Sequence, residues 1–268
     1  MEGVRRYLSS ASPSGGGRIS FGVVPHAGWI YSGRVAGTVY SKIIPAQTCI
    51  FLATNHTGLG PRTSIFPDGT WQMPLGSFEV DNGLAQRILK HSKSMTPDTE
   101  AHLYEHAIEV QLPFLNAMNP HSRIVCIEMQ DYRWETCSDT AISVAHAIEE
   151  TLHDSPDASF AVLASSDMTH CGESYGQLPP PNITAGDFAK QHDQPALEKM
   201  IHMDPRGLLE TVKTKKITMC GSGPAAAVIE CARLLGAQKG QLLTYATSAD
   251  VSGPDSDMAV GYAGMVFH

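Results

Sequence analysis

The sequence is short of positive charge. It has 19 lysines and arginines against 27 aspartates and glutamates, which gives a net charge of −8. Its densest basic segment is the short stretch Lys213-Thr214-Lys215-Lys216. Because binding to a phosphate backbone or to anionic lipid needs a broad basic surface, we expect neither nucleic acid nor an anionic membrane as the main partner.

Long apolar runs are also missing. No segment reaches the roughly 18 apolar residues that mark a membrane-spanning helix, so we expect no membrane span. The first 20 residues are polar and rich in Gly and Ser, and they lack the apolar core of a signal peptide. Both absences favour a cytoplasmic protein.

Cysteine is sparse and irregularly spaced. The chain of 268 residues has 6 cysteines, and none of them form a CxxC pair. This pattern argues against a secreted disulfide scaffold and against a local zinc finger. Cysteines inside apolar runs, such as Cys49 and Cys126, are typical of small core residues.

What the sequence does contain is an alternation of short apolar runs with segments of helical periodicity, which is typical of an α/β fold. The expected strands are 19–24, 49–53, 123–129, 160–164, 241–246 and 260–267. The expected helices are 32–43, 84–89, 106–118, 136–152, 188–201, 205–212 and 223–235, with Pro113 kinking or breaking the third. We expect a single α/β domain over residues 19–268, preceded by a flexible or truncated segment, residues 1–18.

Four polar motifs stand where these segments end or begin. They are Pro25-His26-Ala27-Gly28, Asn55-His56-Thr57-Gly58, Ser165-Ser166-Asp167-Met168-Thr169-His170 and Met219-Cys220-Gly221-Ser222-Gly223-Pro224. Three follow expected strands, and the fourth opens an expected helix. Because ligands of open α/β sheets bind beyond the carboxyl ends of the strands, the motifs predict one site at that edge.

His26 and His56 occupy equivalent positions after two successive strands. Either one alone is as well explained by a hydrogen-bonded turn histidine as by a functional group. Together they favour a metal site, since imidazole is the commonest ligand for intermediate metals.

Asp167 and His170 are three residues apart after a third strand. On a helical turn they would share a face, so that the carboxylate could orient the imidazole or both could point into a pocket. A serine nucleophile at Ser165 or Ser166 is disfavoured, because the chain has no GxSxG turn around them.

Cys220 precedes Gly221-Ser222-Gly223-Pro224 at the start of a helix. The helix dipole is expected to lower the pKa of a thiol there, which suits a thiolate ligand or a nucleophile. The competing interpretation is a buried small residue.

Glu105, His106 and Glu109 form a second polar cluster, which His102 is close enough in sequence to join. The HExxH motif of helical zinc sites is absent. The cluster is therefore expected to cap a helix and support the ligands rather than to form the primary site.

In combination these motifs resemble the Memo family. The resemblance extends over most of residues 19–268 and keeps the family's order. It rests on Pro25-His26-Ala27-Gly28-Trp29 with Tyr31-Ser32-Gly33, Asn55-His56-Thr57-Gly58, Glu105 to Phe114, Ser165 to His170, Met219-Cys220-Gly221 and Gly261-Tyr262-Ala263-Gly264.

The resemblance implies a three-layer α/β/α fold with a central mixed sheet, similar to the class III extradiol dioxygenases, which bind non-haem iron. It implies His26, His56 and Cys220 as the metal-binding set, with Asp167 and His170 lining the same pocket. A cysteine takes the place of the dioxygenase carboxylate, so catechol ring cleavage does not carry over. Thiolate favours iron, copper(I) or zinc over harder ions, and we expect one iron or copper ion rather than zinc.

The resemblance also implies AMMECR-type and radical SAM proteins as partners, because prokaryotic relatives are named as one component of such a system. Glu105, His106 and Trp29 would lie around the pocket. Trp29 replaces the commoner tyrosine at its mouth. The helix that usually precedes the first strand is reduced here to residues 4–9, which is why the start is expected to be truncated or divergent.

Three functions compete at this stage. The first is a metal-dependent redox enzyme with His170 as acid or base and Asp167 orienting it. The second is a binding module in which the same pocket recognises a small molecule, a peptide or a partner without catalysis. The third is a zinc-type hydrolase. The sequence ranks them in that order.

Overall fold

A central mixed sheet organises the molecule. The structure, a computed structural model, describes residues 2–8, 17–74, 76–253 and 256–268. Within them the sheet has nine strands in the order β10-β11-β1-β8-β2-β7-β3-β6, with β9 pairing β11. The strands are β1 (Ile19–Val24), β2 (Thr48–Thr54), β3 (Thr63–Ile65), β6 (Thr96–Pro97), β7 (Arg123–Met129), β8 (Phe160–Ser165), β9 (His170–Cys171), β10 (Gly240–Thr247) and β11 (Ala259–Phe267). A separate hairpin joins β4 (Thr70–Met73) to β5 (Gly76–Glu79).

The middle of the sheet is parallel. β8 pairs in parallel with both β1 and β2, and β2 pairs in parallel with β7. The carboxyl ends of these four strands therefore meet at one edge. β11 runs antiparallel to β1 and β10, which makes the sheet mixed. The expected α/β class with a central mixed sheet is confirmed.

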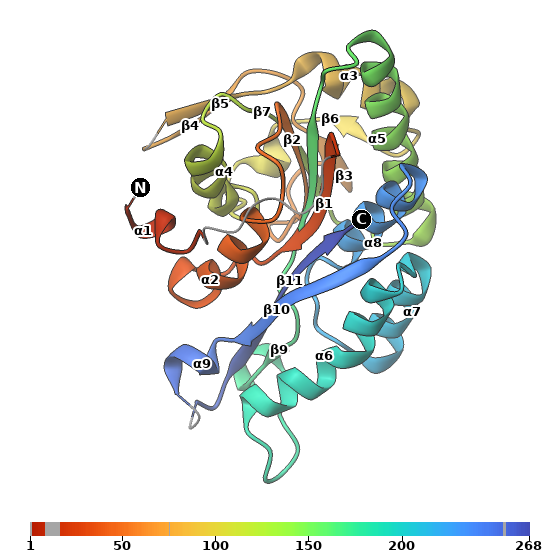
Figure 1. The fold of residues 1–268 in the computed structure, drawn as a ribbon. Coiled ribbons are helices and arrows are strands. Elements are labelled where there is room, and N and C mark those ends of the chain that lie inside the picture. The colour runs from red at the N-terminus through yellow and green to blue at the C-terminus, as the bar shows by residue number, and fades with distance from the viewer. Residues whose placement is uncertain (1, 9–16, 75, 254–255) are drawn as a thin grey trace.

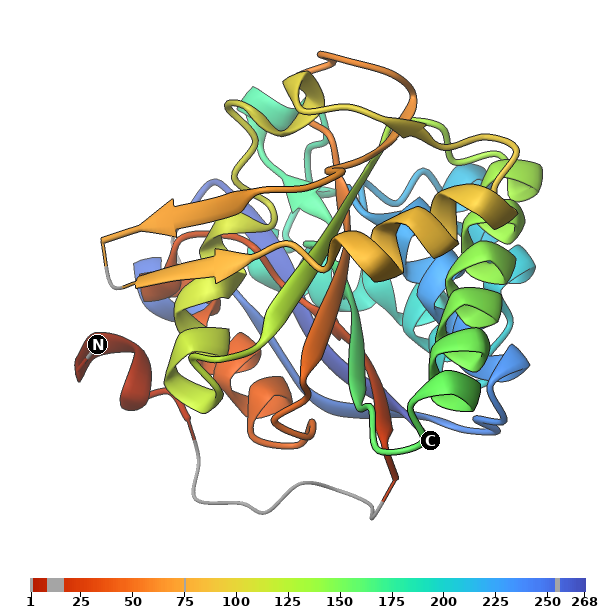
Figure 2. The same ribbon diagram turned by 90° about the horizontal axis from the view of Figure 1, so that it is seen from above.

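Helices cover both faces of the sheet (Figures 1 and 2). On one face lie α3 (Asn82–His91), α5 (Trp134–Asp154) and α8 (Ser222–Leu234), with α7 (Pro205–Lys215) packed on α8. α6 (Ala185–Ile201) packs on α7, β10 and β11. On the other face lie α1 (Glu2–Arg5), α2 (Trp29–Tyr40) and α4 (Leu112–Met118), while α9 (Ala249–Ser252) sits beside β10. The result is the three-layer arrangement expected from the resemblance.

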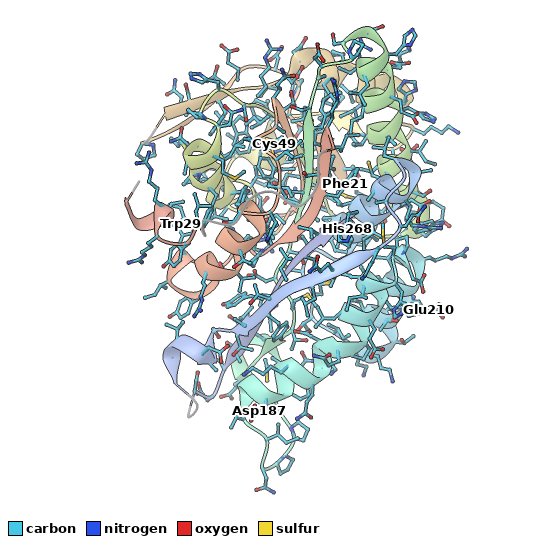
Figure 3. All side chains as sticks on the ribbon, in the orientation of Figure 1. Phe21, Trp29, Cys49, Asp187, Glu210 and His268 are labelled. Carbon is cyan, nitrogen blue, oxygen red and sulfur yellow. The ribbon has the colours of Figure 1, made fainter. Side chains whose placement is uncertain are left out.

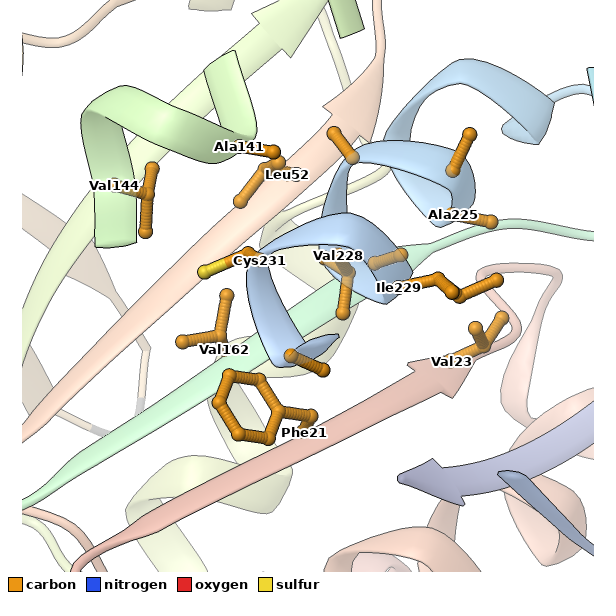
Figure 4. Packing of buried hydrophobic residues seen from close by; sticks show 14 of the residues in the cluster. Phe21, Val23, Leu52, Ala141, Val144, Val162, Ala225, Val228, Ile229 and Cys231 are labelled. Atoms are coloured by element: carbon orange, nitrogen blue, oxygen red, sulfur yellow. The ribbon is translucent and has the colours of Figure 1, made fainter. Parts of the chain in front are cut away.

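Alternation along the strands divides the core between these two faces. In β2, Ile50 and Leu52 join the cluster under α5 and α8, whereas Cys49, Phe51 and Ala53 join the cluster under α2 and α4. Every residue of β2 is buried, as is usual for a parallel strand with helices on both sides. Figure 4 shows α8 laid over the strands, with its apolar side chains against those of β1 and β8.

Several predicted helix starts differ from the observed ones, and two of these differences have a clear local cause. The helix expected from residue 32 begins at Trp29, because Gly28 already accepts hydrogen bonds from Tyr31 and Ser32. The Ser32 hydroxyl turns back to the Ala27 carbonyl instead of capping a helix. In the segment expected to be helical from residue 106, the helix begins only at Leu112, since Pro113 lacks the N–H that a helix interior needs.

The N-terminal segment, residues 1–18, is only partly described. Residues 2–5 form α1, and Val4 is buried in the core. The backbone of Tyr7 lies against Gly37, where a Cβ atom would overlap it. Residues 1 and 9–16, on which much of the expected flexibility or truncation falls, lie outside the described residues. Among the described helices, none is long and apolar enough to cross a bilayer.

Candidate metal centre and ligand pocket

The predicted motifs converge at the carboxyl edge of the parallel strands. His26 follows β1, His56 follows β2, and Asp167 follows β8. Cys220 comes directly before the loop that opens α8, and its Sγ lies 3.3 Å from Nε2 of His26. Residues 194 positions apart in the chain thus meet through the fold alone.

Three imidazoles form the centre of this edge, and we call them the imidazole cluster: His26, His56 and His106. Their ring centroids are 5.1 Å (His26–His56), 5.5 Å (His26–His106) and 5.2 Å (His56–His106) apart. One ligand atom from each lies within 4.8 Å of the others, and within the described part of the chain this is the group of three or more that meets this criterion. Cys220 borders the cluster from the side of His26.

Ser165 fixes the tautomer of His26. Its hydroxyl donates to the Ala107 carbonyl at 2.6 Å and has no second hydrogen. The oxygen therefore accepts, both from Nε2 of Gln111 at 3.0 Å and from Nδ1 of His26 at 3.1 Å. His26 consequently carries its proton on Nδ1 and presents the Nε2 lone pair to the cluster. Burial lowers the pKa of His26 to about 4, so the ring is neutral at neutral pH.

Glu105 holds the other two imidazoles. Its Oε1 lies 3.0 Å from Nδ1 of His56 and 3.2 Å from Nδ1 of His106. It also accepts from the backbone N–H groups of His56, His106 and Ala107. Because the carboxylate engages Nδ1 of both rings, the nitrogen left for a ligand is Nε2. This arrangement is common behind metal-binding histidines.

Glu105 and His106 stabilise each other's charged forms. Burial alone would raise the pKa of Glu105, but hydrogen bonds from His106 and His56 outweigh it and hold that pKa far below its usual range. The hydrogen bond that His106 donates to Glu105 also raises the pKa of His106, although partial burial opposes this shift. Glu105 is therefore a fixed negative charge with only 1% of its side chain exposed.

Cys220 is held in place by hydrogen bonds to its sulfur and to its carbonyl oxygen. Its Sγ accepts from the N–H of Asp167 at 3.3 Å, and its carbonyl accepts from the hydroxyls of Thr54 and Tyr132. Gly221 packs directly on Ser166, and a Cβ atom there would collide with it. The position of the sulfur is thus set by the fold.

The expected lowering of the Cys220 pKa is wrong. Burial, with the nearby Asp167 carboxylate, raises it to about 12. A single helix N-terminus does not offset the loss of water and the presence of a negative neighbour. A bound metal ion reverses this balance, because coordination deprotonates a thiol.

Asp167 and His170 are brought to the same edge but not to each other. Oδ1 of Asp167 accepts from the backbone N–H groups of His26 at 2.9 Å and of Ala27 at 3.4 Å. His170 is oriented by Thr218 instead, with Nδ1 at 3.0 Å from the Thr218 carbonyl and its backbone N–H on the Thr218 hydroxyl. The expected orientation of His170 by Asp167 is therefore corrected.

A cavity of about 250 Å³ opens beside these two residues. Three tyrosines line it, Tyr31, Tyr175 and Tyr262, and we call it the tyrosine pocket. The Tyr175 ring meets His170 edge-on at 5.1 Å. Trp29, expected at the pocket mouth, lies at the start of α2 on the outer side of the molecule (Figure 3). Its Nε1 donates to the Val110 carbonyl at 3.1 Å, and it is not among the residues that line this cavity.

Sequence reasoning missed several residues that build the site. Ser165 was considered only as a nucleophile, and Gln111, which bridges Ser165 to the Pro25 carbonyl, was not considered. Glu128 in β7 was also missed. Within the described residues neither of its carboxyl oxygens has a hydrogen-bond partner, and burial, with Glu105 nearby, raises its pKa well above the usual range. A lone acidic residue in an apolar strand is a pattern that could have drawn attention to it.

His102 lies outside the cluster. Its Nε2 is 3.1 Å from the Ser64 hydroxyl, and its ring packs edge-on against Phe66 and Trp71. It is buried and helps to anchor the loop that carries Glu105 and His106.

Known proteins are similar to this chain over nearly its whole length. Residues 3–266 match the family described as Memo-like protein. A MEMO1 family protein of Methanothermobacter thermautotrophicus is 38% identical over 249 residues, which cover 92% of this chain and 83% of the relative. One from Methanopyrus kandleri is 38% identical over 249 residues (91% and 82%), and one from Saccharolobus islandicus is 40% identical over 246 residues (90% and 80%). The matched region includes every residue of the imidazole cluster.

Proposed function

Because the chain belongs to the Memo family, we propose that it binds one transition-metal ion at the carboxyl edge of its sheet and acts as a metal-dependent redox enzyme. The proposed ligands are Nε2 of His26, Nε2 of His56 and Sγ of Cys220. His106 is the neighbouring imidazole that could complete or replace this set.

The observation that carries the proposal is the shared use of Nδ1. In all three imidazoles of the cluster Nδ1 is held by Ser165 or Glu105, which leaves each Nε2 as the free donor atom. Nitrogen and sulfur ligands of one tetrahedral ion lie about 3.6 Å apart, and two nitrogens about 3.4 Å, by the usual bond lengths. The 3.3 Å between Cys220 Sγ and His26 Nε2 fits this spacing. The ligand atoms of the three imidazoles lie within 4.8 Å of one another, so the rings would move closer together on binding an ion.

The donor set supports a transition metal, and we propose iron or copper. Two imidazoles and a thiolate suit iron, copper and zinc, whereas carboxylate and carbonyl oxygens would suit calcium or magnesium. When bound, iron or copper supplies reversible one-electron transfer. The six cysteines are free, and we propose a cytoplasmic location, since a reducing compartment keeps the Cys220 thiol available as a ligand.

The surrounding residues supply proton handling and shape. Since the carbonyl of Thr218 can only accept, His170 carries its proton on Nδ1 when neutral and offers Nε2 as a base. Asp167 fixes the backbone of the loop that carries His26. We propose His170 as the acid or base of the reaction. AMMECR-type and radical SAM partners remain proposals that rest on the family resemblance.

Metal analysis of anaerobically purified protein tests the proposal. We expect about one iron or copper ion per chain in the wild type and loss of that ion in His56→Ala and Cys220→Ser. His106→Ala separates the two ligand sets: metal retained in this variant supports Cys220 as the third ligand, whereas metal lost here but kept in Cys220→Ser assigns that place to His106. His121→Ala, an exposed histidine, is the matched control.

Two outcomes would overturn the redox proposal. Protein that contains no metal, even after anaerobic supply of iron and copper, would leave a binding module. Stoichiometric zinc with hydrolysis of esters or amides and no oxygen uptake would favour the hydrolase.

A further inference from the structure

We propose that the tyrosine pocket binds a protonated amine, so that the natural ligand carries a small ammonium group. This inference rests on the proposed function, because it names the class of ligand presented to the same site. Its grounds are the free hydrogen-bond acceptors of the pocket, its aromatic lining and the charges of its lining residues.

Asp167 supplies the negative charge. Both backbone donors that reach its carboxylate bind Oδ1, so Oδ2 keeps its lone pairs. In the described part of the chain, the nitrogen that faces Oδ2 is Nε2 of His26, 4.0 Å away and beyond hydrogen-bond distance. That nitrogen bears no proton in the tautomer that Ser165 imposes, so it cannot satisfy Oδ2. Asp167 is only 4% exposed, and a carboxylate this well shielded from water gains strongly from a cationic donor.

His170 supplies a second acceptor at the same wall. Its Nδ1 hydrogen points to the Thr218 carbonyl, which leaves the Nε2 lone pair for a ligand. An ammonium group has several N–H donors and no acceptor, so it complements a wall that offers two acceptors. An anionic group would face the Asp167 carboxylate there.

The tyrosines supply the remaining surface. Tyr31 and Tyr175 are 39% and 42% exposed, while Tyr262 is buried at 1% exposed. Aromatic rings around a cation stabilise it through their negative faces. Among the residues that the structure describes, the lining contains one carboxylate and no lysine or arginine side chain. With a volume of about 250 Å³, the cavity admits a small molecule or a single side chain rather than a folded partner.

A titration with three small probes tests the inference on metal-free wild-type protein. The probes are propylammonium, 1-propanol as its uncharged counterpart, and tetramethylammonium as a cation without N–H donors. Binding is followed by two-dimensional NMR at neutral pH. We expect propylammonium to bind at least about 10-fold more tightly than 1-propanol, with tetramethylammonium in between, because it keeps only the attraction to the rings. The shifted signals should include Tyr175 and His170.

Variants separate the two contributions. Asp167→Asn keeps the shape of the side chain and should weaken propylammonium binding about 10-fold. Tyr175→Leu should weaken it about 3-fold, whereas Tyr175→Phe keeps the ring and should change it less than about 2-fold. His121→Ala, the exposed histidine that serves as the control for metal binding, should leave amine binding unchanged.

Equal binding of propylammonium and 1-propanol would overturn the inference, and so would tighter binding of inorganic phosphate at the same residues. Because the titration uses metal-free protein, its result does not depend on the metal. If the wild type binds metal but not the amine, only this inference fails. If it binds the amine but no metal, the redox proposal fails and the amine pocket stands.

Discussion

The imidazole cluster and the tyrosine pocket lie side by side at one edge of the sheet. They differ in how their polar atoms are hydrogen-bonded within the chain. In the cluster, Nδ1 of every ring is engaged within the chain, and Glu105 receives hydrogen bonds on both oxygens. In the pocket, Asp167 and His170 each retain a free acceptor atom. In the cluster, the chain satisfies Nδ1 of each ring and thereby orients the free Nε2 atoms, whereas in the pocket a carboxylate oxygen and a ring nitrogen are left for a donor from outside.

The two carboxylates show what this difference means. Glu105 is surrounded by donors of its own chain, so its charge serves to orient His56 and His106. Asp167 uses one oxygen to shape the His26 loop and has the other available. Orientation of donor atoms is what a metal site needs, whereas unsatisfied acceptors are what a ligand site needs.

The largest expected difference between the two regions is in how they change the free energy of unfolding when the pH is lowered. The pKa of His26 is about 4 in the fold against 6.5 for an unburied imidazole, so between these values the unfolded chain binds more protons. The stability that His26 contributes is present above pH 6.5 and is lost as the pH falls towards 4, by about 3 kcal/mol. His102 shifts in the same direction, also by burial.

Urea unfolding of the metal-free protein from pH 7.5 to pH 4 measures this loss. His26→Gln should reduce the decline by about 3 kcal/mol and leave the part that His102 contributes. Tyr175→Phe in the tyrosine pocket should keep the full decline. A wild type whose unfolding free energy stays constant between pH 6.5 and 4 would contradict the idea that the cluster is buried in neutral form.

Removing the charge behind the cluster should have the next largest effect. Glu105→Gln keeps the shape but removes the negative charge and turns one acceptor oxygen into a donor. It therefore loses either the hydrogen bonds from both rings at Oε1 or the one from the His56 backbone N–H at Oε2. We expect metal affinity to fall about 10- to 100-fold, as is common for the groups behind metal-binding histidines. Amine binding in the tyrosine pocket should not change.

Competition with a chelator measures the affinity, and Glu109→Gln is the matched control from the same segment, because that side chain is exposed. If Glu105→Gln holds metal as tightly as the wild type, the orientation of the rings by Glu105 does not matter for binding.

The smallest effect is expected at Trp29, which belongs to neither region. Trp29→Phe loses the hydrogen bond to the Val110 carbonyl but keeps an aromatic ring near Phe114. We expect a loss of about 0.5–1 kcal/mol in the free energy of unfolding, measured in urea. Metal and amine affinities should remain within about 2-fold of the wild type, and a larger change in either would place Trp29 functionally at the pocket mouth.

Much of the fold could be predicted because its central strands are six or seven residues long and mostly apolar. The segments 19–24 and 123–129 were predicted with the same bounds as β1 and β7. β3, β6 and β9 were missed because strands of two or three residues have no periodicity to detect. The β4–β5 hairpin was missed because its exposed, polar strands resemble a loop.

Only the site residues that directly follow a strand could be predicted from the sequence. His26, His56 and Asp167 follow buried strands, so their meeting could be inferred from parallel pairing. His106 lies in a loop with short 3₁₀ turns, and the register by which it returns to the sheet edge is set by tertiary contacts such as those of His102. The shift in the Cys220 pKa was mispredicted because burial is a property of the whole fold, whereas the helix start is visible locally.

The separation of 194 residues between His26 and Cys220 has a consequence for the chain as a polymer. An ion bound to both would cross-link the first strand to the loop before α8 and close most of the chain into a ring. Because the unfolded chain cannot easily bring these residues together, such a link favours the folded state. With free metal about 1,000-fold above its dissociation constant, the folded state gains about 4 kcal/mol. Metal binding would therefore stabilise the whole domain, and the concentration of free metal would set the fraction of the protein that is unfolded.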